Sequence, residues 1–206
     1  MKLVLHPTYF PNIANFKAII SHDITWEVSG NYQKQTLRNR CYISTDRGEH
    51  MLTIPIKHVG SGGKRLYKDI KLDNKYPWQR QHWRTLETAY RTSPYFEYYE
   101  DDILPLYTQK FDTLLEFNLK TIAIIFDCLQ LDIPTKRTTV FEKKLIDTID
   151  ARLLAKVKNG FELEQEEYVQ VFSDRNDFVK NCSILDLLFN EGTNTLTYLN
   201  NQKINF

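Results

Sequence analysis

The sequence lacks most of the features that assign a chain to a protein class at first reading. Only three cysteines occur in 206 residues, and none of Cys41, Cys128 and Cys182 forms a CxxC pair. This spacing predicts neither a disulfide framework nor a zinc site. The longest apolar run, at 122–126, ends at Asp127 and is much shorter than the roughly 20 residues of a membrane-spanning helix. We therefore expect no membrane span.

The opening residues also lack a recognisable leader. The apolar run at 3–5 meets His6 and Pro7, which makes it too short for the core of a signal peptide. Because the few cysteines also suit a reducing compartment, the sequence predicts a soluble, cytoplasmic protein.

No established catalytic or cofactor signature is present. The chain has no Ser-His-Asp order, HExxH motif, EF-hand loop or dinucleotide fingerprint, so hydrolase, metal and NAD chemistry have no direct support. The sequence predicts no metal ligand and leaves the cofactor unknown. The stretch Gly60–Gly63, followed by Lys64 and Arg65, lacks the GxxxxGK[ST] pattern, which favours a flexible surface connection over a phosphate-binding loop.

Apolar and aromatic residues are abundant. Hydrophobic residues make up 42% of the chain and aromatic residues 13%, enough for a sizeable core in one unit. Most of the rings are expected in that core, although aromatic side chains also suit stacking against sugars or bases.

The small net charge conceals an asymmetry along the chain. Residues 31–91 contain 13 Lys and Arg against 5 Asp and Glu, a net +8, whereas residues 92–206 carry a net −7. The basic middle is either a solvated face or a binding surface for phosphates of a small ligand. No nucleic-acid-binding signature is present, so we expect no nucleic-acid partner.

Hydrophobic periodicity predicts a mixture of strands and helices. In the first part we expect strands at 3–5 and 24–28, a helix after Pro11 with apolar residues at 13, 16, 19 and 20, and a hairpin of 41–44 with 51–56. Further on we expect helices at 78–89, from Leu104 or Leu106 to Phe126 with a break at Asn118, and at 143–157, then a strand at 168–172 and a helix at 184–189 capped by Ser183.

This order predicts an α/β or α+β fold, with short strands in the N-terminal part, a helical annex and a C-terminal helix. No linker or repeat divides the chain, so residues 1–206 are expected to form one unit. Within it, 1–75 should be mainly strands and loops with one helix, 76–160 mainly helical, and 161–206 a C-terminal strand and helix packing back.

Four ordered motifs together resemble the WbqC-like family, whose members are encoded among bacterial surface-polysaccharide and O-antigen genes. They are HPTYFPNIANF with His6 where the family usually has Gln, TLRNRCYI with its Asn-Arg step, the segment LTIPI with the helix WQRQHWRTLETAYRTSPYFE, and NCSILDLLFNEG with Cys182 in place of Leu. The resemblance implies a cytoplasmic role near glycan assembly and a loosely defined transferase activity. It supplies no catalytic residues.

The residues beside these motifs suggest a site. If the first strand ends near His6, then His6 and Tyr9 border a ligand position at the carboxyl end of the sheet, where His6 is either a general base or a structural histidine. Arg38, Asn39 and Arg40 either bind a carboxylate or phosphate or form an ion-pair face.

Two functions follow as hypotheses. The first is a transferase of surface-glycan biosynthesis acting on a phosphorylated or nucleotide-linked substrate, with one basic pocket joining His6, Tyr9, Asn39 and Arg40. The second is a non-catalytic binding or scaffold protein of the same pathway, with an exposed apolar patch. The sequence leaves the oligomeric state open.

Overall fold

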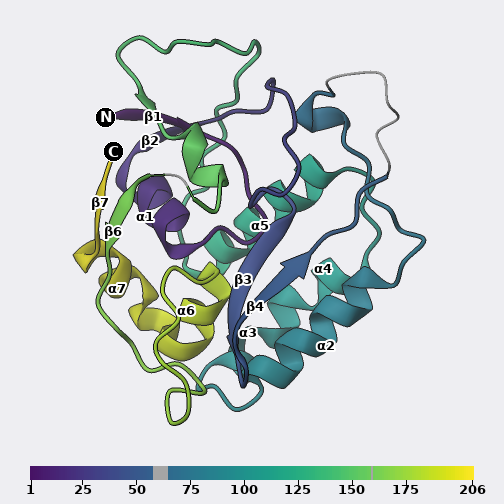
Figure 1. Cartoon of the computed structure of the whole chain (residues 1–206), viewed down its shortest axis with the longest axis vertical. Coiled ribbons are helices and arrows are strands. Elements are labelled where there is room, and N and C mark those ends of the chain that lie inside the picture. The colour runs from purple at the N-terminus through teal and green to yellow at the C-terminus, as the bar shows by residue number, and fades with distance from the viewer. Residues whose placement is uncertain (58–64, 159) are drawn as a thin grey trace.

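A short parallel sheet organises the N-terminal part of the chain (Figure 1). The structure is a computed structural model that describes residues 1–57, 65–158 and 160–206. Strand β1 (Lys2–Leu5) pairs in parallel with β2 (Asp23–Trp26) and with β5 (Ile149–Asp150), which lie on either side of it. The three apolar residues of β1 are buried, as expected for a central parallel strand, and this confirms the first predicted strand.

Helix α1 (Ile13–Ser21) connects β1 to β2 and begins where the sequence predicted. The side chain of Asn12 caps it by accepting a hydrogen bond of 3.0 Å from the backbone N–H of Asn15. The preceding turn holds Phe10 at φ 37°, a strained conformation for a bulky residue. Distant segments hold this turn, because Phe10 N–H donates to Thr121 Oγ1 at 3.4 Å and Ser183 Oγ donates to the Phe10 carbonyl at 3.1 Å.

Strands β3 (Arg40–Thr45) and β4 (Gly48–Thr53) form the predicted hairpin. Its tight turn places Gly48 at φ 84°, which a glycine adopts without strain. The second strand ends before Pro55, because proline has no N–H to donate to a ladder.

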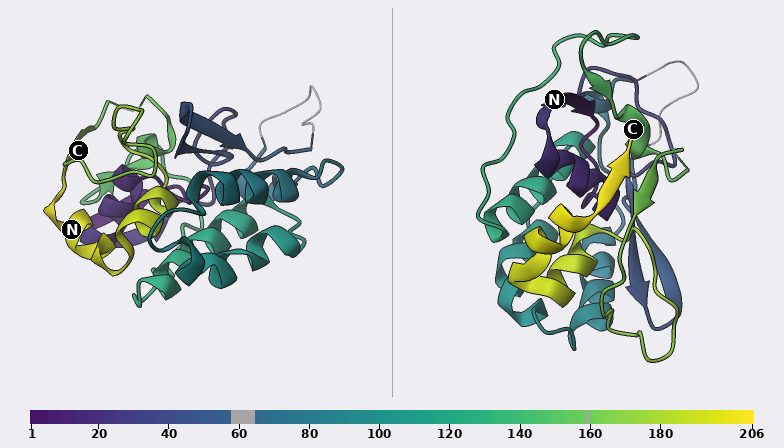
Figure 2. Two further views of the ribbon diagram at one scale, coloured as in Figure 1. Left: turned by 90° about the horizontal axis from the view of Figure 1, so that it is seen from below. Right: turned by 90° about the vertical axis from the view of Figure 1, so that its left-hand side faces the viewer.

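Four helices follow and gather on one side of the molecule (Figure 2). They are α2 (Trp78–Tyr90), α3 (Phe96–Ile103), α4 (Pro105–Thr108) and α5 (Leu114–Cys128), preceded by the short 3-10 turn η1 (Tyr67–Asp69). The predicted break at Asn118 is wrong: the chain turns between α4 and α5, and Asn118 lies buried inside α5. Its side chain donates to the Arg38 carbonyl and to Tyr67 Oη, each at 2.6 Å, so a polar residue is accommodated within a buried helix face.

The helix predicted at 143–157 is also wrong. Described residues there form β5 and the 3-10 turn η2 (Arg152–Ala155), in a region that contains no α-helix between residues 129 and 158. The apolar residues that suggested a helix do not share a buried face, since Ile146 is 82% exposed and Val157 49%. Backbone pairing with β1, which is remote in sequence, determines the conformation instead.

The C-terminal part packs back onto α1 and β3. It contains α6 (Ile184–Glu191), η3 (Gly192–Asn194), α7 (Thr195–Asn201), and the strand pair β6 (Glu162–Glu164) and β7 (Lys203–Asn205). Ser183 caps α6 as predicted, accepting from Leu185 N–H at 3.3 Å. The strand predicted at 168–172 is wrong, because that segment turns inward and directs Tyr168 into the core.

Mixed strands and helices, short N-terminal strands and a C-terminal helix are therefore confirmed as the fold class. One hydrophobic cluster contains residues from β1, α1, the hairpin and the helices α2 to α7. The Gly60–Gly63 stretch lies outside the described residues.

Candidate functional site

The carboxyl ends of β1 and β5 meet at one edge of the parallel sheet, where His6 follows β1 and Arg152 follows β5. Ligands of open α/β sheets commonly bind at this edge. A cavity of about 290 Å³ opens there, called the first cavity below. Its lining residues are His6, Asn31, Gln33, Arg38, Phe141, Asp150, Arg152, Leu153, Ala155 and Lys156.

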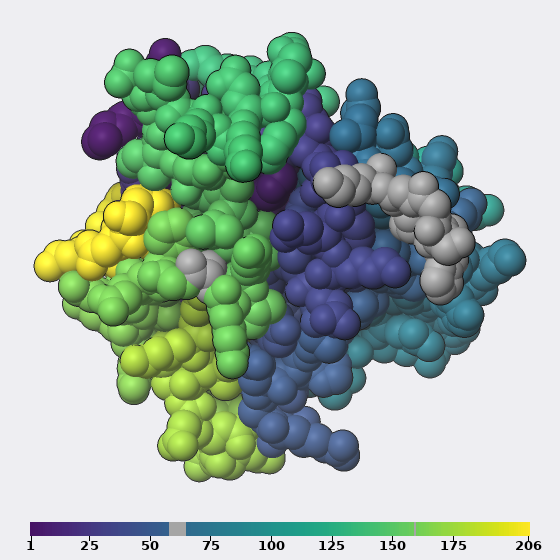
Figure 3. All heavy atoms as spheres, turned by 45° about the horizontal axis from the view of Figure 1, so that its top comes forward, coloured from purple at the N-terminus to yellow at the C-terminus, as the bar shows by residue number. Residues whose placement is uncertain are grey.

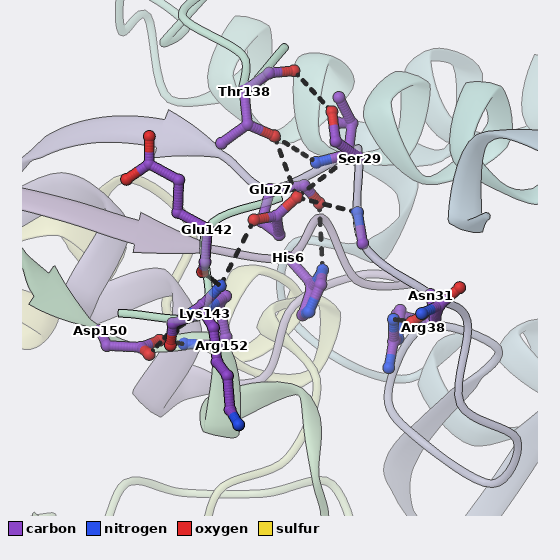
Figure 4. A network of polar contacts seen from close by, with 12 residues as sticks. His6, Glu27, Ser29, Asn31, Arg38, Thr138, Glu142, Lys143, Asp150 and Arg152 are labelled. Carbon is purple, nitrogen blue, oxygen red and sulfur yellow. Dashed lines mark hydrogen bonds and ion pairs between the residues drawn. The ribbon is translucent and has the colours of Figure 1, made fainter. Parts of the chain in front are cut away.

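His6 is held in one orientation within this cavity (Figure 4). Its Nδ1 lies 3.0 Å from the backbone carbonyl of Glu27. A carbonyl only accepts, so Nδ1 carries the proton and Nε2 is the unprotonated nitrogen. Burial, and then the charges of Arg38 and Arg152, lower the pKa of His6 to about 3. His6 is therefore a neutral hydrogen-bonding group at neutral pH.

Arg38 supplies a buried positive charge beside His6. Its side chain is only 2% exposed, and it donates to Thr36 Oγ1 at 3.2 Å and to the Asn31 carbonyl at 3.1 Å. The guanidinium carbon lies 5.4 Å from the ring centroids of both Tyr32 and Tyr67, a distance typical of cation–π contacts. Burial lowers the pKa of Arg38 from its ordinary value, although an arginine stays charged at neutral pH.

No carboxylate in the described part of the chain lies within ion-pair distance of Arg38, although the more distant charge of Glu27 acts to raise its pKa. An unpaired buried charge is costly, and an anionic ligand would offset that cost.

Arg152 lines the same cavity but has protein partners. Its Nη2 and Nε contact Asp150 at 2.6 and 2.8 Å, its Nη1 donates to the Glu142 carbonyl at 2.7 Å, and the same atom lies 3.6 Å from Glu27. The hydrogen bond from Arg152 lowers the pKa of Asp150. Arg152 therefore fixes the cavity wall, and its charge is largely compensated.

A second cavity, of about 250 Å³, lies at the end of the hairpin away from its turn. It is lined by Tyr32, Lys34, Gln35, Asn39, Arg40, Ile56 and Lys57. Residues 31–40 thus contribute to the walls of both cavities. Figure 3 shows the part of the surface where this indigo segment meets the green segment that precedes and follows β5.

Tyr9 faces neither cavity. Its hydroxyl lies 2.9 Å from His82 Nδ1 and 2.9 Å from Tyr107 Oη, and its side chain is 1% exposed. The histidine of α2 is likewise a hydrogen-bonded core residue at 6% exposure.

The single pocket expected to join His6, Tyr9, Asn39 and Arg40 is not formed. Arg38 lies with His6 in the first cavity, whereas Asn39 and Arg40 lie in the second. The catalytic role expected of His6 and the substrate-binding roles expected of Tyr9, Arg38, Asn39 and Arg40 stay predictions.

The sequence did not indicate Asp150, Arg152 or Tyr32 as site residues. Asp150 and Arg152 fell within the erroneous helix at 143–157, and the two-residue strand β5 is too short to leave a periodic signal. The available clue to Tyr32 was its position, because it is an aromatic residue that lies just before the basic segment beginning at Lys34.

A buried carboxylate on α6 forms a contrasting cluster. Asp186 is fully buried and accepts hydrogen bonds from Tyr90 Oη at 2.6 Å, Tyr168 Oη at 2.5 Å and Gln170 Nε2 at 3.0 Å. Burial raises the pKa of Asp186, although these donors oppose the shift. None of the five cavities described borders Asp186. Its hydrogen bonds instead connect α6 to α2 and to the 168–170 segment.

The WbqC-like protein family matches residues 6–159, which include both cavities. The chain belongs to the WbqC-like family. It is also 26% identical over 219 residues to the uncharacterized protein Rv1507c of Mycobacterium tuberculosis (strain ATCC 25618 / H37Rv), an alignment that covers 93% of this chain and 91% of that protein. No solved structure matches the chain.

Two further observations concern other kinds of site on this WbqC-like chain. Within the described ranges, no three His, Cys, Asp or Glu side chains are grouped so that they could hold a metal ion. Among the described helices, none combines the length and apolar character needed to cross a bilayer.

Proposed function

We propose that this WbqC-like protein is a transferase of bacterial surface-glycan biosynthesis that binds a phosphorylated or nucleotide-linked substrate in the first cavity. The observation that carries the proposal is the guanidinium of Arg38, which is 2% exposed, lines the cavity beside His6 and has no ion pair with a described carboxylate. A phosphate oxygen placed against Arg38 would supply the missing counter-charge. The motif resemblance to proteins of O-antigen gene groups supports the pathway.

In this proposal Arg38 holds the phosphate and His6 contacts the acceptor. Nε2 of His6 would accept a hydrogen bond from the acceptor's hydroxyl or amine. The charge of Arg38 is one cause of the low pKa of His6, so a bound anion that offsets this charge would raise that pKa. His6 then becomes a stronger base in the substrate complex than in the free protein.

The proposal assigns the protein to the cytoplasm, where nucleotide-linked sugars would be its substrates, and gives nucleic acid no part in the reaction. The positive lining, with Arg38, Arg152 and Lys156 against Asp150, supports a small anion as ligand.

A thermal-shift series on the full chain tests this function. Inorganic phosphate, nucleoside diphosphates and nucleotide sugars should raise the Tm of the wild-type protein, because a ligand that binds the folded state stabilises it. Arg38→Met should abolish the shift, and Arg38→Lys should reduce it. The matched control is Arg80→Met on the exposed face of α2, which should keep the full shift. Absence of a shift with every phosphorylated ligand would contradict the proposal.

A non-catalytic binding or scaffold function is the second candidate, and one surface feature favours it. The segment around β5 exposes large apolar side chains, which often mark partner interfaces. They are Ile133, Val140, Phe141, Ile146, Leu153 and Val157. The largest of the five cavities described, of about 670 Å³, includes Ile133 in its lining and lies between α5 and residues 133–137. This function predicts that no phosphorylated ligand shifts the Tm.

A further inference from the structure

Three residues that line the second cavity each carry a polar atom without a partner. Tyr32 Oη, Asn39 Oδ1 and Arg40 Nε are each shielded from solvent and have no hydrogen-bond partner in the structure. All three belong to residues that line this one cavity. Buried polar groups are normally paired, so three orphaned atoms on residues of one cavity need an explanation.

The orientation of Asn39 is fixed by its other amide atom. Nδ2 donates to the Ile54 carbonyl at 3.3 Å, so the amide cannot exchange its two ends without losing this bond. Oδ1 is consequently the acceptor end of the amide, and it has no partner. The whole residue is 8% exposed, and the carbonyl of Asn39 also accepts from Ile54 N–H at 2.9 Å, so the backbone is held as well.

The remaining groups determine which ligand would suit the cavity. Arg40 presents its Nε–H donor together with a positive charge, and the exposed side chains of Lys34 and Lys57 add two more cations. Among the described residues that line the cavity, none is acidic. A ligand there must therefore carry an oxyanion for the cations and a donor, such as a hydroxyl, for Asn39 Oδ1.

We propose that the second cavity is a binding site for a hydroxylated oxyanion, of the kind found in a uronic acid or a sugar phosphate. The oxyanion contacts Arg40 and the two lysines, and a neighbouring hydroxyl donates to Asn39 Oδ1 while Tyr32 Oη hydrogen-bonds to another ligand oxygen. Tyr32 joins the two cavities, because its ring also lies against Arg38 of the first. The site therefore suits the sugar portion of a second substrate, and only this last point rests on the proposed transferase function.

Calorimetry on the full chain tests the site separately from the first cavity. The probes are glucuronate and glucose 6-phosphate, with neutral glucose and acetate as controls that lack the charge or the hydroxyls. At least one charged sugar should bind the wild type and the Arg38→Met variant alike, while both controls bind at least tenfold more weakly. The two charged probes distinguish a carboxylate ligand from a phosphate ligand.

Two substitutions should weaken that binding about tenfold: Arg40→Lys, which keeps the charge but removes Nε–H, and Tyr32→Phe, which removes one hydroxyl. Matched controls are Arg47→Lys at the hairpin turn and Tyr76→Phe, a tyrosine that is 63% exposed. Loss of binding in Arg38→Met but not in Arg40→Lys would overturn this inference and leave the proposed function standing. Failure of both charged sugars to bind at millimolar concentration would also overturn it.

The stability of the ligand-free variant provides a second readout. An orphaned hydroxyl contributes nothing to the free fold, so Tyr32→Phe should keep the wild-type Tm or raise it. A lower Tm would mean that the hydroxyl is satisfied within the fold, and the inference would fail.

Discussion

Asp186 on α6 and Arg38 before β3 are two charged residues that lie almost entirely inside the protein. Asp186 accepts hydrogen bonds from three side chains, whereas Arg38 has two neutral acceptors, two aromatic rings and no ion pair with a described carboxylate. Asp186 borders none of the described cavities, and Arg38 lines one. The comparison separates a buried charge whose contacts serve the fold from one whose contacts, in the proposed function, a ligand completes.

Substituting the two residues gives the strongest test of this comparison. Asp186→Ala should lower the free energy of unfolding by about 3 kcal/mol or more, since it leaves two tyrosine hydroxyls and an amide without their acceptor. Arg38→Met should stay within about 1 kcal/mol of the wild type or be more stable, because it removes a buried charge without breaking an ion pair. Urea unfolding of both variants measures the difference.

The control for Asp186 is Asp174→Ala, because Asp174 is exposed and pairs only with its neighbour Arg175. It should change the stability very little. Equal losses for Asp186→Ala and Arg38→Met would show that Arg38 is as much a part of the folded core as Asp186, and the comparison would not hold.

Acid should lower the free energy of unfolding, because one histidine in the first cavity and one in the neighbouring core are buried in their neutral forms. Burial lowers the pKa of His6 to about 3 and that of His82 to about 4, from an ordinary 6.5. As the pH falls below about 6.5, the unfolded chain takes up protons that the folded protein refuses, so the free energy of unfolding falls by up to about 1.4 kcal/mol per pH unit for each histidine.

Urea unfolding at pH 7 and pH 5 checks this expectation. His6→Gln removes one titrating group, so the loss of unfolding free energy between the two pH values should be smaller by up to about 2 kcal/mol. Phosphate binding at pH 7 should be retained if His6 acts only through hydrogen bonds. An unchanged pH dependence would show that His6 is not the buried, neutral group described above. Glutamine is also the residue that the related motif usually carries at this position.

Local patterns were sufficient for the elements whose packing follows from their own sequence. β1, α1, the hairpin and α2 each have a continuous or periodic apolar face with a clear boundary, and each was predicted. α3 was missed although Phe96, Tyr99 and Ile103 lie at helical spacing, because a helix of eight residues repeats this spacing only once. β5 was missed because two residues leave no pattern, and their conformation depends on pairing with β1 across more than a hundred positions.

The site shows the same limit. The basic segment and the Asn-Arg step drew attention to residues 38–40, yet a turn closed by Asn39 N–H to the Thr36 carbonyl at 3.1 Å divides them between two cavities. Tyr9 belongs to the same motif as His6, yet its side chain lies in the core. Its hydroxyl hydrogen-bonds there to His82 and Tyr107, which lie far along the chain. Such long-range contacts cannot be derived from spacing.

The smallest expected effect concerns the loop that forms the wall between the cavities. Gln35 lines the second cavity and has φ 59°, a left-handed conformation that costs a non-glycine residue about 1 kcal/mol. Gln35→Gly should therefore raise the free energy of unfolding by several tenths of a kcal/mol, less than the full strain, because glycine also loses more entropy on folding. The matched control, Gln33→Gly in the same loop, has no such strain to relieve and should be neutral or slightly destabilising. Urea unfolding measures both variants, and an equal loss of stability would show that the left-handed turn at Gln35 is not strained. The wall of the second cavity would then differ less from the well-satisfied Asp186 region than the comparison requires.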